Sequence, residues 1–261
     1  MKRMVGILDH NKVRIDDFPR PCTDIIQGYQ ELSDVAGLVA RVLDQFGIAG
    51  TIPSSYLKPV RPGGVVVGPA ITVRNIPERE VPFRYWSRDA PTLLGEREAF
   101  FLAQPGDVIV IDGSTVFPAS CLGSMAVSLA SRLGVAGVVV SGAVTGVGGI
   151  SSADIPVWAR GGTTVTGHHR VETVEINGPI GIQGVRVEPG DLIVADDSGV
   201  TVVPLALVEP VLECAHEKKA LGSGFRTLIQ QGANRETLRS ELAKLMVALM
   251  RRSAAVSHQD E

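Results

Sequence analysis

Two adjacent histidines are the side chains of this 261-residue chain best suited to exchange protons near neutral pH. They are His168 and His169, in the segment GHHR. Neighbouring residues of an extended segment point to opposite sides, so we expect at most one imidazole to enter a pocket. A solvated loop is the simpler interpretation of the same residues. The pair is therefore a candidate proton carrier that needs a binding site beside it.

A glycine-rich stretch is the candidate for that binding site, although it carries no charge. Residues 137–150 read GVVVSGAVTGVGGI, which predicts a buried strand over 138–140 and then a loop. Gly146 and Gly148 suggest a dinucleotide fingerprint, but Ser151 stands where its last glycine belongs. The stretch therefore predicts a turn or a ligand pocket, and not a nucleotide site.

A predicted helix start just before this stretch supplies hydrogen-bond donors. Apolar residues recur at helical spacing over 122–133, so we expect a helix from between Ser120 and Ser124 to Gly134. The first N–H groups of a helix lack partners within it and attract anions. We expect the next strand to bring two further residues beside them. The candidate substrate-binding residues are Gly123, Ser124, Met125, Ala126, Thr145 and Gly146.

Hydroxyl and carboxylate groups near these elements have more than one interpretation. Ser124 and Thr145 are candidate catalytic donors to an oxyanion, but hydroxyls near a helix start also act as caps. Asp112, and Asp196 or Asp197, follow two related strands and are predicted to cap turns.

The remaining sequence indicates alternating strands and helices. The predicted elements are a helix over 33–47 with Ser33 as its N-cap, strands over 63–75 that break at Gly68–Pro69, and two segments, 105–112 and 188–199, in which a Pro-Gly-Asp turn leads into a strand. From Pro204 onward the chain is predicted to be helical. Its last stripe, typical of a core or a subunit interface, contains Leu238, Leu242, Leu245, Met246 and Leu249.

Composition argues against several classes of partner and site. With 25 basic and 28 acidic residues, the chain has no excess of positive charge that would attract nucleic acid. Its three cysteines, Cys22, Cys121 and Cys214, lack the spacing of a zinc site or a disulfide framework. We see no signal peptide and no apolar run of membrane length, so we expect a cytoplasmic protein without membrane contact. The segment RYWSRD, 84–89, is predicted to form a subunit interface or to bind an acidic ligand.

The order of these landmarks resembles the family that joins 4-hydroxy-4-methyl-2-oxoglutarate aldolase with the regulator of ribonuclease E activity, RraA. The similar stretches are TIPSSYLKPVRPGGVVVGPAITVRN, LGSMAVSLASRLGVAGVVVSGAVTGVGGI, IPVWARG and GVRVEPGDLIVADDSGVTVVP. The resemblance implies an α/β fold, a swivelling β/β/α sandwich over 50–220, with helical extensions over 1–49 and 221–261. It also implies a homo-oligomer, a trimer or a hexamer, with sites between neighbouring subunits.

The sequence departs from the family pattern at the decisive positions. In the aldolases, the resemblance implies a Gly-Ala-Val-Arg-Asp stretch whose arginine binds substrate carboxylate and whose aspartate anchors a divalent metal. Here Thr145 and Gly146 stand at those two positions. Ser124 and Gly149 occupy two further positions that are often acidic. We therefore expect no metal site and no cofactor, because a hard cation prefers charged oxygen ligands.

Two functions remain open from the sequence. The first is a lyase-type enzyme that acts on a small oxo acid or carboxylate without a tightly bound metal, with backbone donors over 123–126 and a proton carrier such as His168 or His169. The second is a non-catalytic, oligomeric binding or regulatory protein.

Overall fold

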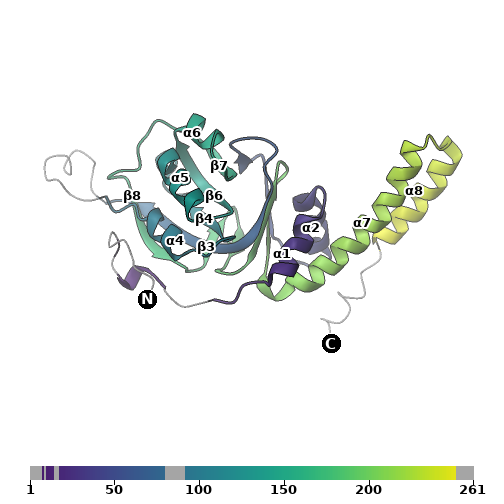
Figure 1. Ribbon diagram of the computed structural model, residues 1–261, viewed down its shortest axis with the longest axis horizontal. Coiled ribbons are helices and arrows are strands. Elements are labelled where there is room, and N and C mark those ends of the chain that lie inside the picture. The colour runs from purple at the N-terminus through teal and green to yellow at the C-terminus, as the bar shows by residue number, and fades with distance from the viewer. Residues whose placement is uncertain (1–7, 9, 15–17, 80–91, 251–261) are drawn as a thin grey trace.

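The computed structural model describes residues 8, 10–14, 18–79 and 92–250 (Figure 1). The predicted interface segment 84–89 lies outside these residues. The helices are α1 (Thr23–Gln30), α2 (Val35–Gln45), α4 (Glu96–Leu102), α5 (Ser124–Arg132), α6 (Val147–Ser151), α7 (Val208–Gln230) and α8 (Arg235–Met250), with 3-10 turns at His10–Lys12 and Leu205–Leu207. No helix within the described ranges combines the length and the apolar character needed to cross a bilayer.

One large sheet carries the fold. Its strands are β1 (Thr51–Pro53), β2 (Lys58–Pro59), β3 (Val66–Pro77), β4 (Val108–Asp112), β5 (Ser120–Gly123), β6 (Gly137–Thr145), β7 (Val157–Gly162), β8 (Val171–Ile176), β11 (Leu192–Asp196) and β12 (Gly199–Val203). The order along it is β1-β12-β11-β3-β4-β6-β7-β2, with β5 also paired to β6 and β8 to β3. Because β3, β4, β6 and β7 run parallel, their carboxyl ends meet at one edge.

Alternate side chains of the central strands face two different layers. In β4, Ile109 and Ile111 pack with α4 and α5, whereas Val108 and Val110 face the opposite layer. That layer is a hairpin of β9 (Ile180–Ile182) and β10 (Val185–Val187). The arrangement of hairpin, sheet and helices is the β/β/α sandwich that the resemblance implies.

Strand β3 corrects one prediction. The expected break at Gly68–Pro69 does not occur, because the strand changes partners there. Its first residues pair antiparallel with β11, and residues 70–74 pair parallel with β4. Gly68 is needed at this crossing, since a Cβ atom there would collide with the carbonyl oxygen of Gly106.

The two Pro-Gly-Asp turns share one geometry, as their repeated sequence predicts. Gly106 and Gly190 have φ angles of 94° and 92°. Asp107 accepts a hydrogen bond from Gln104 N at 2.7 Å, and Asp191 accepts one from Glu188 N at 2.8 Å. In each turn the aspartate closes the bend before a strand begins.

The predicted helix over 33–47 is α2, and its apolar stripe is buried inside the chain. Val39, Val42 and Leu43 are fully buried against β11, β12 and α7. This stripe is therefore not available as an oligomer interface. The N-cap is Asp34, one residue after the predicted Ser33.

Helices α7 and α8 form an arm that projects from the body, with α8 folded back along α7 (Figure 1). The predicted stripe on α8 stays accessible in the single chain. Leu242 and Met246 are each 44% exposed. Leu238, Leu245 and Leu249 are half-buried where α8 packs on α7, so part of the stripe has the packing role. A subunit interface stays a prediction, as does the three-part division of the chain.

Candidate ligand site at the start of α5

Two strand–helix junctions lie side by side at the carboxyl edge of the sheet. β5 leads directly into α5, and β6 leads through Gly146 into α6. The strands are paired in parallel, with Gly123 opposite Thr145. This register confirms the predicted proximity of the helix start and the end of the glycine-rich strand.

The start of α5 carries no side-chain cap. Its N-cap residue, Gly123, is extended and places no side chain over the first turn. The neighbouring Met125 side chain is 78% exposed. The N–H groups of the first turn have no acceptor within the helix and lie at the positive end of its dipole. An oxyanion bound here would be held by backbone donors.

The predicted glycine loop is shorter than expected. β6 continues to Thr145 and α6 begins at Val147, so Gly146 alone joins them. Gly142 lets the strand pass Cys121, because a Cβ atom at Gly142 would lie 2.8 Å from the Cys121 sulfur. Glycines inside a strand read as loop signals in sequence, which explains the error.

Ser124 explains why two of the other glycines are needed. Gly146 has a left-handed φ of 74°, and a Cβ atom there would lie 2.7 Å from Ser124 Oγ. A Cβ atom at Gly149 would lie 2.8 Å from Ser124 Cβ. The glycines therefore leave room for this half-buried serine between the two helix starts. Neither Ser124 nor Thr145 is an N-cap, since Gly123 and Gly146 occupy those positions.

The histidine pair lies in the loop between β7 and β8. Ser120 N donates to Val165 O at 3.0 Å, which fixes that loop along β5. Residues 168 and 169 form a turn in which His169 has a φ of 56°, so the interpretation as a loop is confirmed and the segment is not extended. His168 is exposed and His169 half-buried, with ring centroids 6.2 Å apart. The structure joins Ser124, Thr145 and Gly146 directly, and leaves the histidines on a separate loop.

A polar network supports the ends of the strands. Asp112 Oδ1 accepts hydrogen bonds from Ser114 N at 3.1 Å, from Ser114 Oγ at 2.8 Å and from Ser141 Oγ at 3.0 Å. Ser141 Oγ in turn accepts one from Gly113 N at 2.9 Å. Asp196 caps its turn in the same way, accepting from Ser198 N at 2.7 Å. These aspartates have the predicted role of turn caps.

Two buried groups near β5 have strongly shifted acidities. Burial raises the pKa of Glu96 to about 7, although Arg97 partly opposes the shift. Burial also raises the pKa of the Cys121 thiol to about 12, and the charge of Glu96 adds to this. Sequence reasoning missed Glu96, because a glutamate in a first helical turn usually reads as a solvated residue.

Comparison with known proteins agrees with this architecture. The model of the RraA-like family, described as Aldolase/RraA, matches residues 30–202. The chain belongs to the RraA-like family. The match includes α2, the whole large sheet and both strand–helix junctions, but not the α7–α8 arm.

RraA-like relatives include a candidate enzyme and a regulator. A candidate 4-hydroxy-4-methyl-2-oxoglutarate aldolase of Halalkalibacterium halodurans is 37% identical over 167 residues, covering 64% of this chain and 73% of that protein. The crystal structure of Streptomyces coelicolor RraAS2, described as an unusual member of the RNase ES inhibitor RraA family, has a TM-score of 0.68 at 27% identity, covering 80% and 99%. An uncharacterized protein from Pseudomonas syringae has a TM-score of 0.70 at 23% identity, covering 85% and 100%, which shows the fold alone.

The metal that the RraA-like resemblance implies for aldolases does not fit the residues of this chain. The positions expected to supply carboxylates hold Ser124, Gly146 and Gly149. Gly146 has no side chain, and Ser124 fills the space beside it. Among the described residues, no group of three His, Cys, Asp or Glu side chains is arranged to hold a metal ion. We therefore derive no catalytic step through a metal.

Proposed function

We propose that this RraA-like protein binds a small oxo acid or carboxylate at the start of α5 and acts on it as a lyase without a tightly held divalent metal. The observation that carries the proposal is the first turn of α5 beside the end of β6. Gly123 places no side chain over this turn, and the pairing with β6 brings Thr145 beside it. Backbone N–H groups in this geometry favour a carboxylate or an enolate oxygen.

The proposed chemistry uses these donors to stabilise negative charge. In a retro-aldol step, the C–C bond of a hydroxy oxo acid breaks, its electron pair forms the enolate of one product, and the hydroxyl proton passes to a base. The enolate oxygen would accept hydrogen bonds from residues 124–126 and from the hydroxyl of Thr145. A proton then returns to the enolate carbon. His168 and His169 are the proposed carriers, because their loop runs along β5.

A pair of substitutions at one position tests the backbone donors. Ser124→Pro removes the first N–H of α5, and proline is tolerated at the first position of a helix. Ser124→Ala removes the hydroxyl and keeps the N–H. Isothermal titration with oxalate and pyruvate should show modest binding to the wild type, on the order of 1 mM. We expect at least about a threefold loss in Ser124→Pro and little change in Ser124→Ala. Equal binding by all three proteins contradicts the proposed site.

Turnover is tested separately. Product release from a panel of hydroxy and oxo acids, including oxaloacetate, is followed with and without chelator. The lyase proposal expects activity that chelator leaves unchanged and that falls when His168 or His169 is replaced by glutamine. Binding without turnover across the panel rejects the enzyme and favours the second candidate.

The second candidate is a non-catalytic, oligomeric binding protein. The exposed stripe on α8 supports it, since Leu242 and Met246 have no core to cover them within the described chain. The relationship to RraAS2 supports the same function class. Both candidates expect a trimer or a hexamer. Light scattering at micromolar concentration checks the assembly, and the double variant Leu242→Lys/Met246→Lys should shift it toward a monomer if α8 forms the interface. A monomeric wild type contradicts the assembly.

A further inference from the structure

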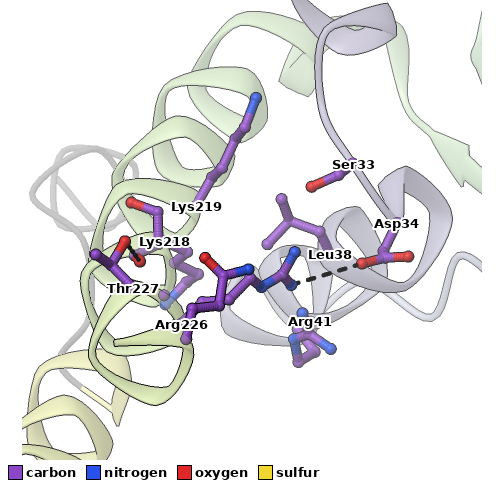
Figure 2. Close-up of a pocket in the computed structure, with 11 residues that line it drawn as sticks. Ser33, Asp34, Leu38, Arg41, Lys218, Lys219, Arg226 and Thr227 are labelled. Carbon is purple, nitrogen blue, oxygen red and sulfur yellow. Dashed lines mark hydrogen bonds and ion pairs between the residues drawn. The ribbon is translucent and has the colours of Figure 1, made fainter. Parts of the chain in front are cut away.

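A pocket lies between α2 and α7, away from the strand–helix junctions. It has a volume of about 350 Å³. One wall comes from α2 and the turn before it, and the other from the second half of α7 (Figure 2). The α7 wall follows residue 202, where the match to the RraA-like family ends. The pocket therefore depends on an element outside the matched region.

The lining of this α2–α7 pocket is strongly basic. Four cationic side chains contribute to it, namely Arg41, Lys218, Lys219 and Arg226. Asp34 is the single acidic residue of the lining. The whole chain has a formal charge of −3, so this concentration of positive charge is not a reflection of composition. Such a pocket attracts anions and repels cations.

The two lysines are held in place but keep donors for a ligand. Lys219 Nζ donates to Glu31 O at 2.7 Å, and Lys218 Nζ donates to Leu249 O at 3.0 Å. An ammonium group has three donors, so each of these bonds uses one of them. These bonds fix two charges at the edge of the pocket without neutralising either.

The positive charges of the two arginines are neutralised even less by neighbouring residues. Figure 2 shows Arg226 reaching from α7 toward α2, where its guanidinium lies 3.9 Å from Asp34 Oδ2. The two side chains of this pair are 67% and 82% exposed, so a ligand displaces the pair at little cost. Arg41 is exposed and has no ion pair with another residue of the described ranges. Two guanidinium forks are thus left for planar, bidentate recognition of oxyanions.

The neutral groups of the pocket narrow the ligand class. Ser223 Oγ already donates to Ala220 O at 2.7 Å, and Thr227 Oγ1 to Ser223 O at 3.1 Å. Recognition therefore rests on the four cations. A single carboxylate would leave most of them unmatched, whereas linked phosphates carry several charges within a small volume. We infer that the α2–α7 pocket binds a small ligand with two or more phosphate groups. This inference does not depend on the proposed lyase function.

Inorganic pyrophosphate is the probe for the test. Isothermal titration with the full chain should give a Kd on the order of 0.1 mM or tighter. Orthophosphate should bind at least about tenfold more weakly, since one phosphate cannot engage both walls. Citrate, at matched ionic strength, distinguishes carboxylate from phosphate recognition and should also bind more weakly.

A matched pair of double variants separates the pocket from general charge. Arg41→Ala/Arg226→Ala should weaken pyrophosphate binding at least about tenfold. Arg235→Ala/Arg239→Ala removes the same charge from exposed positions on α8 that do not line the pocket, and should stay within about twofold of the wild type. Far-UV circular dichroism and melting temperature confirm folding of both. Absence of pyrophosphate binding to the wild type, equal losses in the two variants, or tighter binding of citrate would each overturn the inference.

Discussion

The start of α5 and the α2–α7 pocket are both suited to anions, but by opposite means. At α5 the proposed donors are backbone N–H groups beside Gly123, and the side chains of the first turn, Ser124, Met125 and Ala126, are neutral. In the α2–α7 pocket the donors are four long cationic side chains. The first arrangement selects by shape and proximity, because a backbone cannot adapt. The second selects by charge, because flexible side chains adapt to many shapes. The two proposals together predict that one chain separates two anion classes that a single cationic site would bind alike.

The largest expected effect comes from restoring charged side chains beside the start of α5. Thr145→Arg/Gly146→Asp supplies the two groups that the family pattern places there. We expect the variant to bind Mn²⁺, which the wild type should not hold stoichiometrically, and to decarboxylate oxaloacetate at a rate above that of free metal. Titration calorimetry measures the binding, and pyruvate release with and without chelator measures the activity.

A second version of this variant tests whether Ser124 obstructs the new aspartate. The side chain that Gly146→Asp introduces would meet the Ser124 hydroxyl, so the same double variant is also made with Ser124→Gly. Metal binding that needs Ser124→Gly locates the obstacle in this serine. If both folded variants bind metal and neither has activity, the mapping of this site onto an aldolase centre is wrong.

The buried acid Glu96 gives the next largest effect. Glu96 is 2% exposed, and burial raises its pKa from 4.5 to about 7. A raised folded-state pKa contributes stability that is complete below 4.5 and is lost as pH rises through 7. Glu96→Gln stays neutral, so its advantage over the wild type should grow by about 2–3 kcal/mol from pH 5 to pH 8.

Urea unfolding at the two pH values measures this difference. Asp191 has a pKa raised mainly by burial, so the variant keeps part of the pH dependence of the wild type. Glu213→Gln, at an exposed position of α7, is the control and should change nothing with pH. If the difference in unfolding free energy between Glu96→Gln and the wild type is the same at both pH values, the raised pKa of Glu96 is contradicted.

A smaller effect tests the packing of the two helix starts. Gly146→Ala should destabilise the protein by about 2 kcal/mol, because alanine is strained at a φ of 74° and its Cβ meets Ser124 Oγ. Combination with Ser124→Gly should recover the steric part only. Gly148→Ala is the matched control, since no atom lies within 4 Å of a Cβ there, and should be neutral or stabilising. Thermal unfolding of the four proteins checks the order.

The smallest effect concerns the charged pocket. Arg226→Ala should change the free energy of unfolding by less than about 0.5 kcal/mol, because its pair with Asp34 is long and exposed. The same change should weaken pyrophosphate binding several-fold. A large stability loss without a binding loss would show that the arginine holds α7 in place and does not recognise a ligand.

The sequence predicted the parts of this architecture that rest on local signals. The Pro-Gly-Asp turns, α2 and α5 follow from turn chemistry and apolar periodicity, and the position of Thr145 beside the start of α5 follows from the strand that comes next in the chain. The errors at Gly68 and Gly142 have one cause. Both glycines sit inside strands because another segment crosses closely, and such tertiary contact leaves no local trace. The α2–α7 pocket was missed for the same reason, since its cations come from segments about 180 residues apart.

Strand β3 also has a consequence for how the chain is made. Its first half pairs with β11, which lies about 120 residues later in the chain, since Pro69 is the partner of Leu192. Ribosomes add roughly 5–20 residues per second, so this half of β3 emerges many seconds before its partner exists. Val66 and Val67 are apolar, pair with β11 and are buried in the folded protein. Nascent chains cut short before residue 192 should therefore be clients of chaperones, whereas chains that extend beyond β12 should close the sheet and leave them.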